Sequence, residues 1–277
     1  MKRIKWFALG IAALIALIAC GQKKAAPKVL VLYYSQTSNT KAVAEEIAGK
    51  LGADIEEIVP VTPYDGDYQS TIARSMQDRE AGVTPEIQPL KADLSAYDTI
   101  FIGFPVWFGT YAPPIATLLD QVNLSGKKVV PFCTFGSGGL DSSVRNIRIK
   151  QPQADVLDGY GVRAARMDAV PKEIDQFLKA NGFLEGEFVK LEAFPEEHPV
   201  SEEEAAIFQA AVSTYPMMAN TAAATVASRT LPNGIEYLFT ATEKPREDNP
   251  QMPPAGPMKV YVTVEDGQAP VFTQVVR

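Results

Sequence analysis

Residues 29–40 read VLVLYYSQTSNT, an apolar run followed at once by hydroxyl and amide side chains. Six apolar or aromatic residues in succession, 29–34, are typical of a strand buried on both faces of a parallel sheet. A helix is expected next, because Val43, Ile47 and Leu51 recur every four residues and share one helical face. A buried strand that leads into a helix is the first unit of an alternating α/β fold.

The alternation of strands and helices continues to about residue 180. Further strands are expected at 54–59, 99–104, 127–134 and 155–160, and further helices at 68–80 (with Ile72 and Met76 on one side), 113–122, 140–149 and 169–180. Strands joined by crossover helices form a parallel sheet with helices on both faces. Ligands of such sheets bind beyond the carboxyl ends of the strands, so the loops after the first, third and fourth strands are the candidate site.

The loop after the first strand, 35–40, offers four hydroxyls, two amides and the free N–H groups of a helix start. Unpaired donors at a helix N-terminus favour an anion such as a phosphate. The loop contains no lysine or arginine, and it lacks the glycines and the lysine of a nucleotide-triphosphate loop. On these residues alone, a phosphate site and an ordinary cluster of helix-capping side chains both remain open.

Two further loops carry unusual residues at the ends of buried strands. Residues 105–114 read PVWFGTYAPP, and residues 134–139 read TFGSGG. Aromatic rings at a strand end offer flat apolar faces, and glycines let the backbone approach a planar ligand and donate N–H groups. Taken separately, the first loop would be explained by rim packing. A flexible linker is the alternative for the second, but glycine-rich linkers rarely follow a buried strand directly. Together with 35–40, the two loops describe a phosphate cradle, an aromatic wall and a set of backbone donors.

With these three loops in this order, residues 28 to about 183 resemble the flavodoxins, in particular the short flavodoxin-like proteins of bacterial anaerobes. The resemblance covers somewhat more than half of the chain. It implies a five-stranded parallel sheet of order 2-1-3-4-5 and a non-covalently bound flavin mononucleotide (FMN). In such a protein the chain binds and tunes the flavin, which itself carries out the redox chemistry.

The resemblance also implies a role for individual loop residues. The phosphate would be held by Ser35, Thr37, Ser38, Asn39 and Thr40. The isoalloxazine ring would stack on Trp107, with Pro105, Val106, Phe108 and Gly109 around it and a backbone group near Gly109 close to flavin N5. The pyrimidine edge would meet Phe135, Gly136, Ser137 and Gly138, and the second face of the ring would meet Phe135 or Tyr68. These loops contain no candidate acid–base pair or nucleophile.

Three functions follow from this interpretation and remain open. The first is a membrane-anchored electron-transfer protein whose partner is a redox protein or a small-molecule electron acceptor. The second is an FMN-dependent NAD(P)H:quinone-type oxidoreductase, and the third is a binding module that uses the fold as a scaffold. Arg145, Arg148 and Lys150, on the helix after the third loop, are either a solvated face or a contact for an anionic partner.

The chain begins with an export signal. Residues 1–20 read MKRIKWFALGIAALIALIAC, a basic start followed by an uncharged apolar run too short for a membrane-spanning helix. The end of this run, 17–20, resembles a bacterial lipobox, which implies cleavage before Cys20 and a lipid on its thiol. A generic signal with a fortuitous cysteine is the alternative. We therefore expect a signal peptide at 1–19, a tether at 20–27 and a lipid-anchored protein of the bacterial cell envelope.

Composition excludes several classes of protein. Loss of residues 1–19 leaves 23 basic and 33 acidic residues, a net charge of −10, so nucleic acid is not expected as a partner. Two cysteines and a single histidine, His198, argue against a disulfide scaffold and against a metal site. Cys133 follows a hydrophobic run, and we expect a small buried core residue there rather than a redox thiol.

Residues 186–277 do not continue the alternation. A helix is expected at 201–212, which Ser201 and Glu204 begin with a capping box, and strands are expected at 222–229, 235–242, 258–264 and 271–276. One helix before about four antiparallel strands predicts an α+β domain at 186–277, faintly similar to the cystatin-type fold, behind a flavodoxin-like domain at 28–185. Residues 243–257 are expected to form a mobile loop and His198 to lie in an exposed linker.

Overall fold

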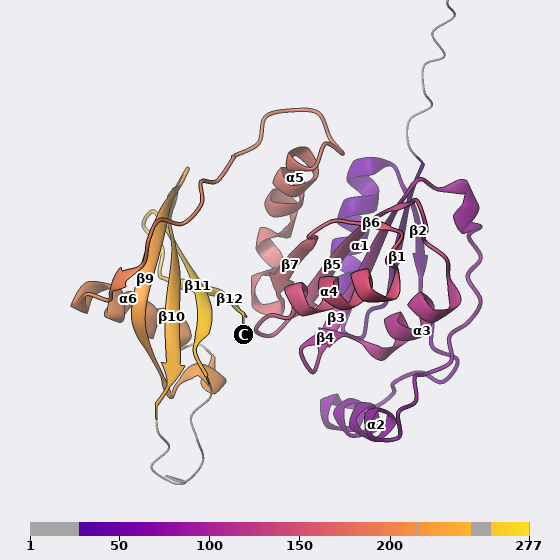
Figure 1. The fold of residues 1–277 in the computed structure, drawn as a ribbon, viewed down its shortest axis with the longest axis horizontal. Helices are drawn as coiled ribbons and strands as arrows, with labels where there is room; N and C mark the ends of the chain where they lie inside the picture. The colour runs from indigo at the N-terminus through magenta and orange to yellow at the C-terminus, as the bar shows by residue number, and fades with distance from the viewer. Residues whose placement is uncertain (1–27, 214, 245–255, 277) are drawn as a thin grey trace, which may run out of the picture.

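The chain folds into two units, each with its own sheet (Figure 1). The computed structural model describes residues 28–213, 215–244 and 256–276. The signal, the tether with Cys20 and most of the predicted 243–257 loop lie outside the described residues. The two sheets draw on residues 29–163 and 198–276, and the boundary near residue 185 stays a prediction.

The larger sheet is built from parallel strands. β1 (Val29–Tyr33), β2 (Asp54–Glu57), β3 (Thr99–Trp107), β5 (Lys128–Phe135) and β6 (Asp155–Val156) lie in the order β2-β1-β3-β5-β6, and β7 (Tyr160–Arg163) pairs with β5 beyond β6. With β6 and β7 counted as one strand, this is the predicted order 2-1-3-4-5.

The fifth strand is divided in two, which the sequence analysis did not predict. Gly159, between the two pieces, has a φ of 81°, and a Cβ there would overlap the carbonyl oxygen of Pro131 on β5. Pro131 has no N–H to donate to a neighbouring strand. The chain therefore bulges beside the proline and resumes its pairing at Tyr160, which lies opposite Phe132.

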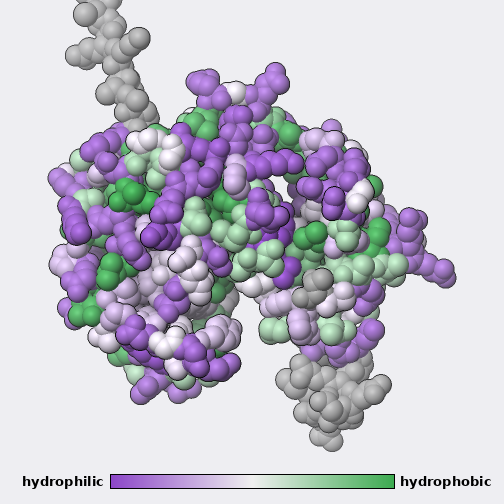
Figure 2. Space-filling model, turned by 180° about the vertical axis from the view of Figure 1, so that it is seen from behind, coloured by the Kyte–Doolittle hydropathy of each residue, from purple (hydrophilic) through white to green (hydrophobic). Residues whose placement is uncertain are grey.

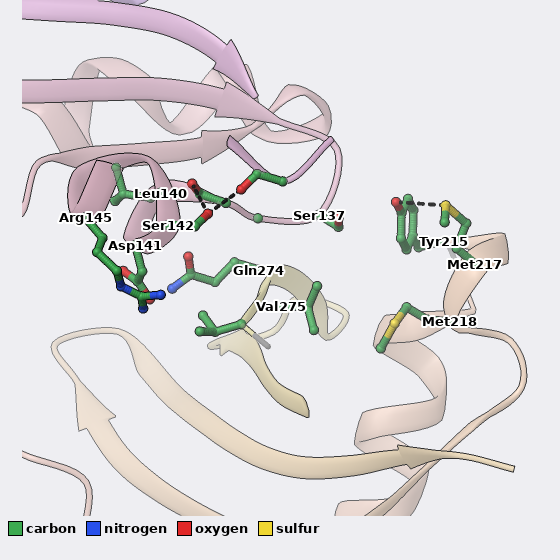
Figure 3. A pocket seen from close by; sticks show the side chains of 14 residues that line it. Ser137, Leu140, Asp141, Ser142, Arg145, Tyr215, Met217, Met218, Gln274 and Val275 are labelled. Atoms are coloured by element: carbon green, nitrogen blue, oxygen red, sulfur yellow. Dashed lines mark hydrogen bonds between the residues drawn. The ribbon is translucent and has the colours of Figure 1, made fainter. Parts of the chain in front are cut away.

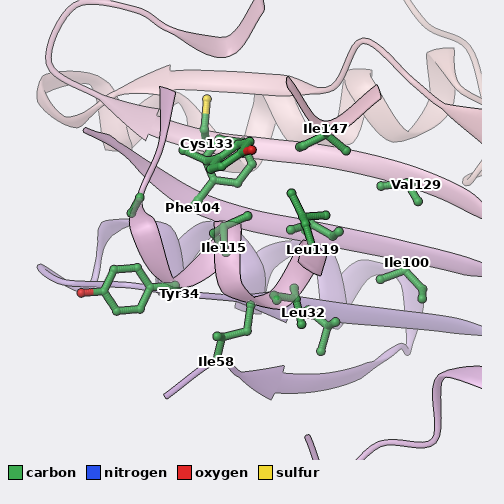
Figure 4. Packing of buried hydrophobic residues seen from close by; sticks show 14 of the residues in the cluster. Leu32, Tyr34, Ile58, Ile100, Phe104, Ile115, Leu119, Val129, Cys133 and Ile147 are labelled. Carbon is green, nitrogen blue, oxygen red and sulfur yellow. The ribbon is translucent and has the colours of Figure 1, made fainter. Parts of the chain in front are cut away.

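Helices cover both faces of the larger sheet. α1 (Asn39–Leu51) and α5 (Val170–Ala180) pack on one face, and α3 (Pro113–Gln121) and α4 (Leu140–Lys150) on the other. Because side chains alternate along a strand, β1 contributes to two cores. Val31 and Tyr33 pack into the first core, under α1 and α5, and Leu30 and Leu32 pack into the second core, under α3 and α4. Figure 4 shows the second core, in which Cys133 lies fully buried as predicted. Burial raises the pKa of the Cys133 thiol well above its ordinary value.

α2 (Tyr68–Glu80) differs from these helices. It lies at the edge of the larger unit, off both faces of the sheet (Figure 1). Its first turn is capped by the Asp67 carboxylate, which accepts a hydrogen bond from the Ser70 N–H at 2.8 Å. The side marked by Ile72 and Met76 is not the buried one, since Met76 is exposed.

The C-terminal unit is a curved antiparallel sheet with one helix against it. β9 (Thr221–Leu231), β10 (Gly234–Glu243), β11 (Met258–Glu265) and β12 (Val271–Val276) confirm the four predicted strands, and a short β8 (His198–Pro199) pairs with β9. α6 (Glu202–Val212) begins with the predicted capping box and buries Phe208 against Phe239. His198 is exposed, as predicted, although it belongs to β8.

Seen from behind, the two units form lobes that meet over a limited band, with hydrophilic and hydrophobic residues mixed over both (Figure 2). None of the described helices is long and apolar enough to span a membrane.

Candidate functional site

A cavity of about 490 Å³ opens at the carboxyl edge of the parallel sheet. We call it the edge cavity. It lies between the loop after β1, the ends of β3 and β5, and α2 with the segment before it. The predicted site residues that line it are Thr37, Asn39, Tyr68, Pro105, Val106, Trp107, Phe108, Phe135 and Gly136. The structure thus brings together residues from all three predicted loops.

The aromatic wall of the edge cavity is a tight hairpin rather than an open loop. β3 continues to Trp107, and β4 (Thr110–Tyr111) pairs back against it. The two turn residues, Phe108 and Gly109, both have positive φ, 50° and 81°, which is the geometry of the turns that join twisted strands. Phe108 adopts this conformation at a steric cost, and its ring remains 47% exposed at the mouth of the cavity.

Trp107 is held in place by two tyrosines. The centroid of its ring lies 5.9 Å from that of Tyr34 and 5.0 Å from that of Tyr64, with both pairs close to perpendicular. Edge-to-face pairs of this kind are favoured by the ring quadrupoles. Tyr34 is tied down in turn, because its hydroxyl donates to Gln36 Oε1 at 2.6 Å. The indole is therefore a fixed part of the wall.

The loop after β1 does not behave as a simple capping cluster. Ser38 is the N-cap residue of α1, with a φ of 65°, and its side chain makes no capping hydrogen bond. Ser35 Oγ accepts from the Lys41 N–H at 3.2 Å, and Thr40 is buried with its hydroxyl 2.8 Å from that of Thr134. Ser35, Ser38 and Thr40 do not line the cavity, whereas Thr37 and Asn39 do.

The glycine-rich loop after β5 is shared between two cavities. Gly136 lines the edge cavity, but Ser137 and Gly138 line a second cavity of about 400 Å³, as does Gly109. The Val275 N–H donates to the Ser137 carbonyl at 2.6 Å, and a Cβ on Gly138 would overlap the Val275 carbonyl. Two of the four residues predicted to meet the pyrimidine edge, Ser137 and Gly138, thus contact β12 instead, an outcome that no local pattern in the sequence could indicate.

The second cavity lies between the two units (Figure 3). Arg145 and Asp141 of α4 lie at one end with Gln274 directed toward them, and Tyr215, Met217 and Met218 lie at the other. Of the three basic residues singled out on this helix, Arg145, Arg148 and Lys150, only Arg145 lines the second cavity. Arg148 pairs with Asp158 at 2.8 Å and Lys150 pairs with Asp120, so these two cations belong to a solvated, ion-paired helix face.

Arg163 joins the edge cavity to the C-terminal unit, and the sequence analysis missed it. The side chain is buried, and its guanidinium donates to the carbonyls of Gly136 at 2.9 Å and of Phe272 at 2.8 Å. It also lies 4.3 Å from the centroid of the Phe272 ring. Burial lowers the pKa of Arg163 from its ordinary value. The available signal was a cationic residue at the end of a short apolar strand.

Residues 28–176 match the family model described as flavodoxin, so the chain belongs to the flavodoxin family. A protein of Gluconacetobacter diazotrophicus named NAD(P)H dehydrogenase (quinone) is 35% identical over 99 residues, 34% of this chain and 46% of that protein. A protein of the same name from Azorhizobium caulinodans is 30% identical over 134 residues, 43% of this chain and 63% of that protein. The chain therefore spans less than two thirds of either relative.

Solved structures of flavoproteins are also similar to this chain. A putative flavoprotein from Bacteroides eggerthii is 30% identical, with 56% of this chain and 98% of that chain covered and a TM-score of 0.49. A flavoprotein from Lactobacillus acidophilus in complex with FMN is 31% identical, with 53% and 98% covered and a TM-score of 0.44.

Substitution of Gly138 tests whether β12 is seated on the glycine-rich loop. A methyl group at Gly138 would strike the Val275 carbonyl, so Gly138→Ala should destabilise the protein by about 1–3 kcal/mol in urea unfolding. Gly136→Ala is the matched control, because its Cβ would meet only the Tyr215 hydroxyl at 3.8 Å. Equal stability of the two variants would contradict this arrangement.

Proposed function

We propose that the edge cavity binds FMN and that the protein transfers electrons through it. The observation that carries this proposal is the meeting of three elements at one edge of the sheet: the hydroxyl and amide loop at the start of α1, the Trp107 hairpin and the end of β5. The cavity volume lies in the range of sites for small organic ligands.

The residues of the edge cavity suit the parts of FMN. Thr37, Asn39 and the N–H groups of the first turn of α1, apart from that of Lys41, which donates to Ser35 Oγ, would hold the phosphate without a cationic side chain. Trp107 and Phe108 would cover the ring and exclude water from it. Bound FMN would supply the uptake and release of electrons, which no amino-acid side chain of the cavity could perform.

The charge of the lining bears on the redox potential. Asp67 is the single ionisable acid or base, tyrosine apart, among the described residues that line the edge cavity. Hydrogen bonds from Ser70 hold the pKa of Asp67 below its ordinary value, so this group stays an anion near neutral pH. Aromatic walls and an anion disfavour added negative charge, although two cations lie behind the lining: Arg163 donates to the Gly136 carbonyl at 2.9 Å, and Arg79 lies 5.6 Å from the centroid of the Phe108 ring. The lining therefore supports a low-potential electron carrier.

Removal of the Trp107 ring should weaken FMN binding. Trp107→Ala should cost more than about 1 kcal/mol of binding free energy, a loss of more than about fivefold in affinity, and should restore the fluorescence of the flavin. Trp107→Phe keeps a ring between Tyr34 and Tyr64, so its affinity for FMN should lie between that of Trp107→Ala and that of the wild type. Fluorescence titration of the apoprotein measures both effects. Exposed Phe188, outside the cavity lining, provides the control Phe188→Ala. Unchanged affinity and fluorescence would remove Trp107 from the site.

A second candidate function is an FMN-dependent NAD(P)H:quinone-type oxidoreductase. The relatives named NAD(P)H dehydrogenase (quinone) favour it, and so does the exposure of Phe108 and Tyr68 at the cavity mouth, where a small acceptor could approach.

Turnover with NADPH and menadione separates the carrier from the reductase. For a carrier, we expect the holoprotein to bleach slowly, at well below about one turnover per second, the lower end of ordinary enzymes. Free FMN at the same concentration is the control. Protein-dependent turnover above that rate would contradict the electron-carrier proposal and support the oxidoreductase.

We also propose that a lipid on Cys20 anchors the protein in the bacterial cell envelope. The support is the basic and apolar segment 1–19 that precedes this cysteine. In a bacterial host, Cys20→Ser should move the protein from the membrane fraction to the soluble fraction, because the lipid acceptor is lost. Fractionation followed by immunoblotting measures the change, with Cys133→Ser as the matched control. Continued membrane retention of Cys20→Ser would contradict the lipid anchor.

A further inference from the structure

α2 buries two of its hydroxyl side chains and exposes two of its larger apolar or aromatic ones. Thr71 and Ser75, one turn apart, are 8% and 1% exposed, whereas Tyr68 is 74% and Met76 is 46% exposed. A surface helix of a globular protein normally shows the opposite pattern. The buried side of α2 faces the edge cavity, which Thr71 and Ser75 both line.

Ser75 has an unused hydrogen-bonding group. In the part of the chain that the structure describes, its Oγ is the one buried side-chain oxygen or nitrogen without a hydrogen-bond partner. Buried polar groups in native proteins are nearly always paired, because burial without a partner is costly. Because Ser75 is among the residues that line the edge cavity, a bound ligand is the expected partner of its hydroxyl.

Part of the loop predicted to meet the pyrimidine edge faces away from the edge cavity. Ser137 and Gly138 contact β12 and line the second cavity, so that only Phe135 and Gly136 of this loop line the edge cavity. The loop therefore offers fewer donors to the ring carbonyls of a bound flavin. On α2, the unpaired Ser75 hydroxyl offers a further donor.

We propose that the Ser75 hydroxyl donates a hydrogen bond to a ring carbonyl of the bound flavin, which makes α2 the fourth wall of the site and Ser75 a cofactor-positioning residue. This inference rests on the proposed function. The chemistry around Ser75 fits the ring rather than the phosphate: Ile72 and Tyr68 are apolar or aromatic neighbours on α2, and the Asp67 carboxylate at its start would repel a dianion.

Substitution of Ser75 should change the free and the bound protein in opposite directions. Ser75→Ala removes an unpaired buried hydroxyl, so the melting temperature of the apoprotein should rise or stay unchanged. The same variant loses a hydrogen bond to the ligand, so it should bind both FMN and riboflavin roughly five- to twentyfold more weakly. The midpoint potential of bound flavin should become more negative, because a donor to the electron-rich reduced ring is lost. A merely structural role would lower the melting temperature as well as the affinity.

Gln77→Ala is the control, since Gln77 is exposed on the same helix and lies outside the cavity lining. Unchanged affinity of Ser75→Ala for both ligands would overturn the inference, as would a loss confined to FMN, which would assign Ser75 to the phosphate. If the wild-type apoprotein binds neither FMN nor riboflavin, the proposed function itself fails, and the wild-type titration alone reveals this.

Discussion

The hydroxyls of Thr40 and Thr134 share a buried hydrogen bond, 2.8 Å between their oxygens, across 94 residues of sequence. It links the first turn of α1, the helix that follows β1, to the end of β5. β1 and β5 are the two strands that flank β3. Because β1, β3 and β5 are parallel, their carboxyl ends lie at the same edge of the sheet. This constraint collects chain segments near residues 37, 107 and 135 around one cavity. Without this arrangement of strand ends, the loop after β1, the Trp107 hairpin and the glycine-rich loop after β5 would not line one cavity.

Much of the larger unit could be predicted because its central strands, β1, β3 and β5, are buried on both faces. Such strands form unbroken apolar runs, and the helices between them show a four-residue period, so that element order follows from local pattern. The bulge at Gly159 was not predicted because it depends on Pro131 of the neighbouring strand β5, which has no N–H to donate. α2 was placed correctly along the chain, but its buried side was not foreseen. Periodicity assigns apolar residues to the inside, and here Thr71 and Ser75 are inside instead.

The candidate site was predictable in part for the same reason. Residues at or just beyond the ends of β1 and β3, such as Thr37 and Trp107, line the edge cavity because the strand ends fix their position. Ser137 and Gly138 are only two and three residues beyond Phe135, and yet they line another cavity. Their position is decided by β12, more than 130 residues later in the chain. Long-range docking of this kind leaves no periodic or local signal in the loop itself.

Because β12 packs against it, the glycine-rich loop contacts the C-terminal unit as well as the edge cavity. Its glycines permit a close backbone approach, and at Gly138 the approaching backbone is that of Val275. Arg163 then links the same loop to β12 through two carbonyls, those of Gly136 and Phe272. Gly136 lines the edge cavity, so a single buried cation contacts both the cavity wall and the C-terminal unit. A shift of the Gly136 carbonyl on ligand binding would have to be absorbed by Arg163 or passed to β12, since a buried guanidinium cannot leave either carbonyl unpaired without cost. Through Arg163 the C-terminal unit is therefore in hydrogen-bonded contact with the wall of the candidate flavin site.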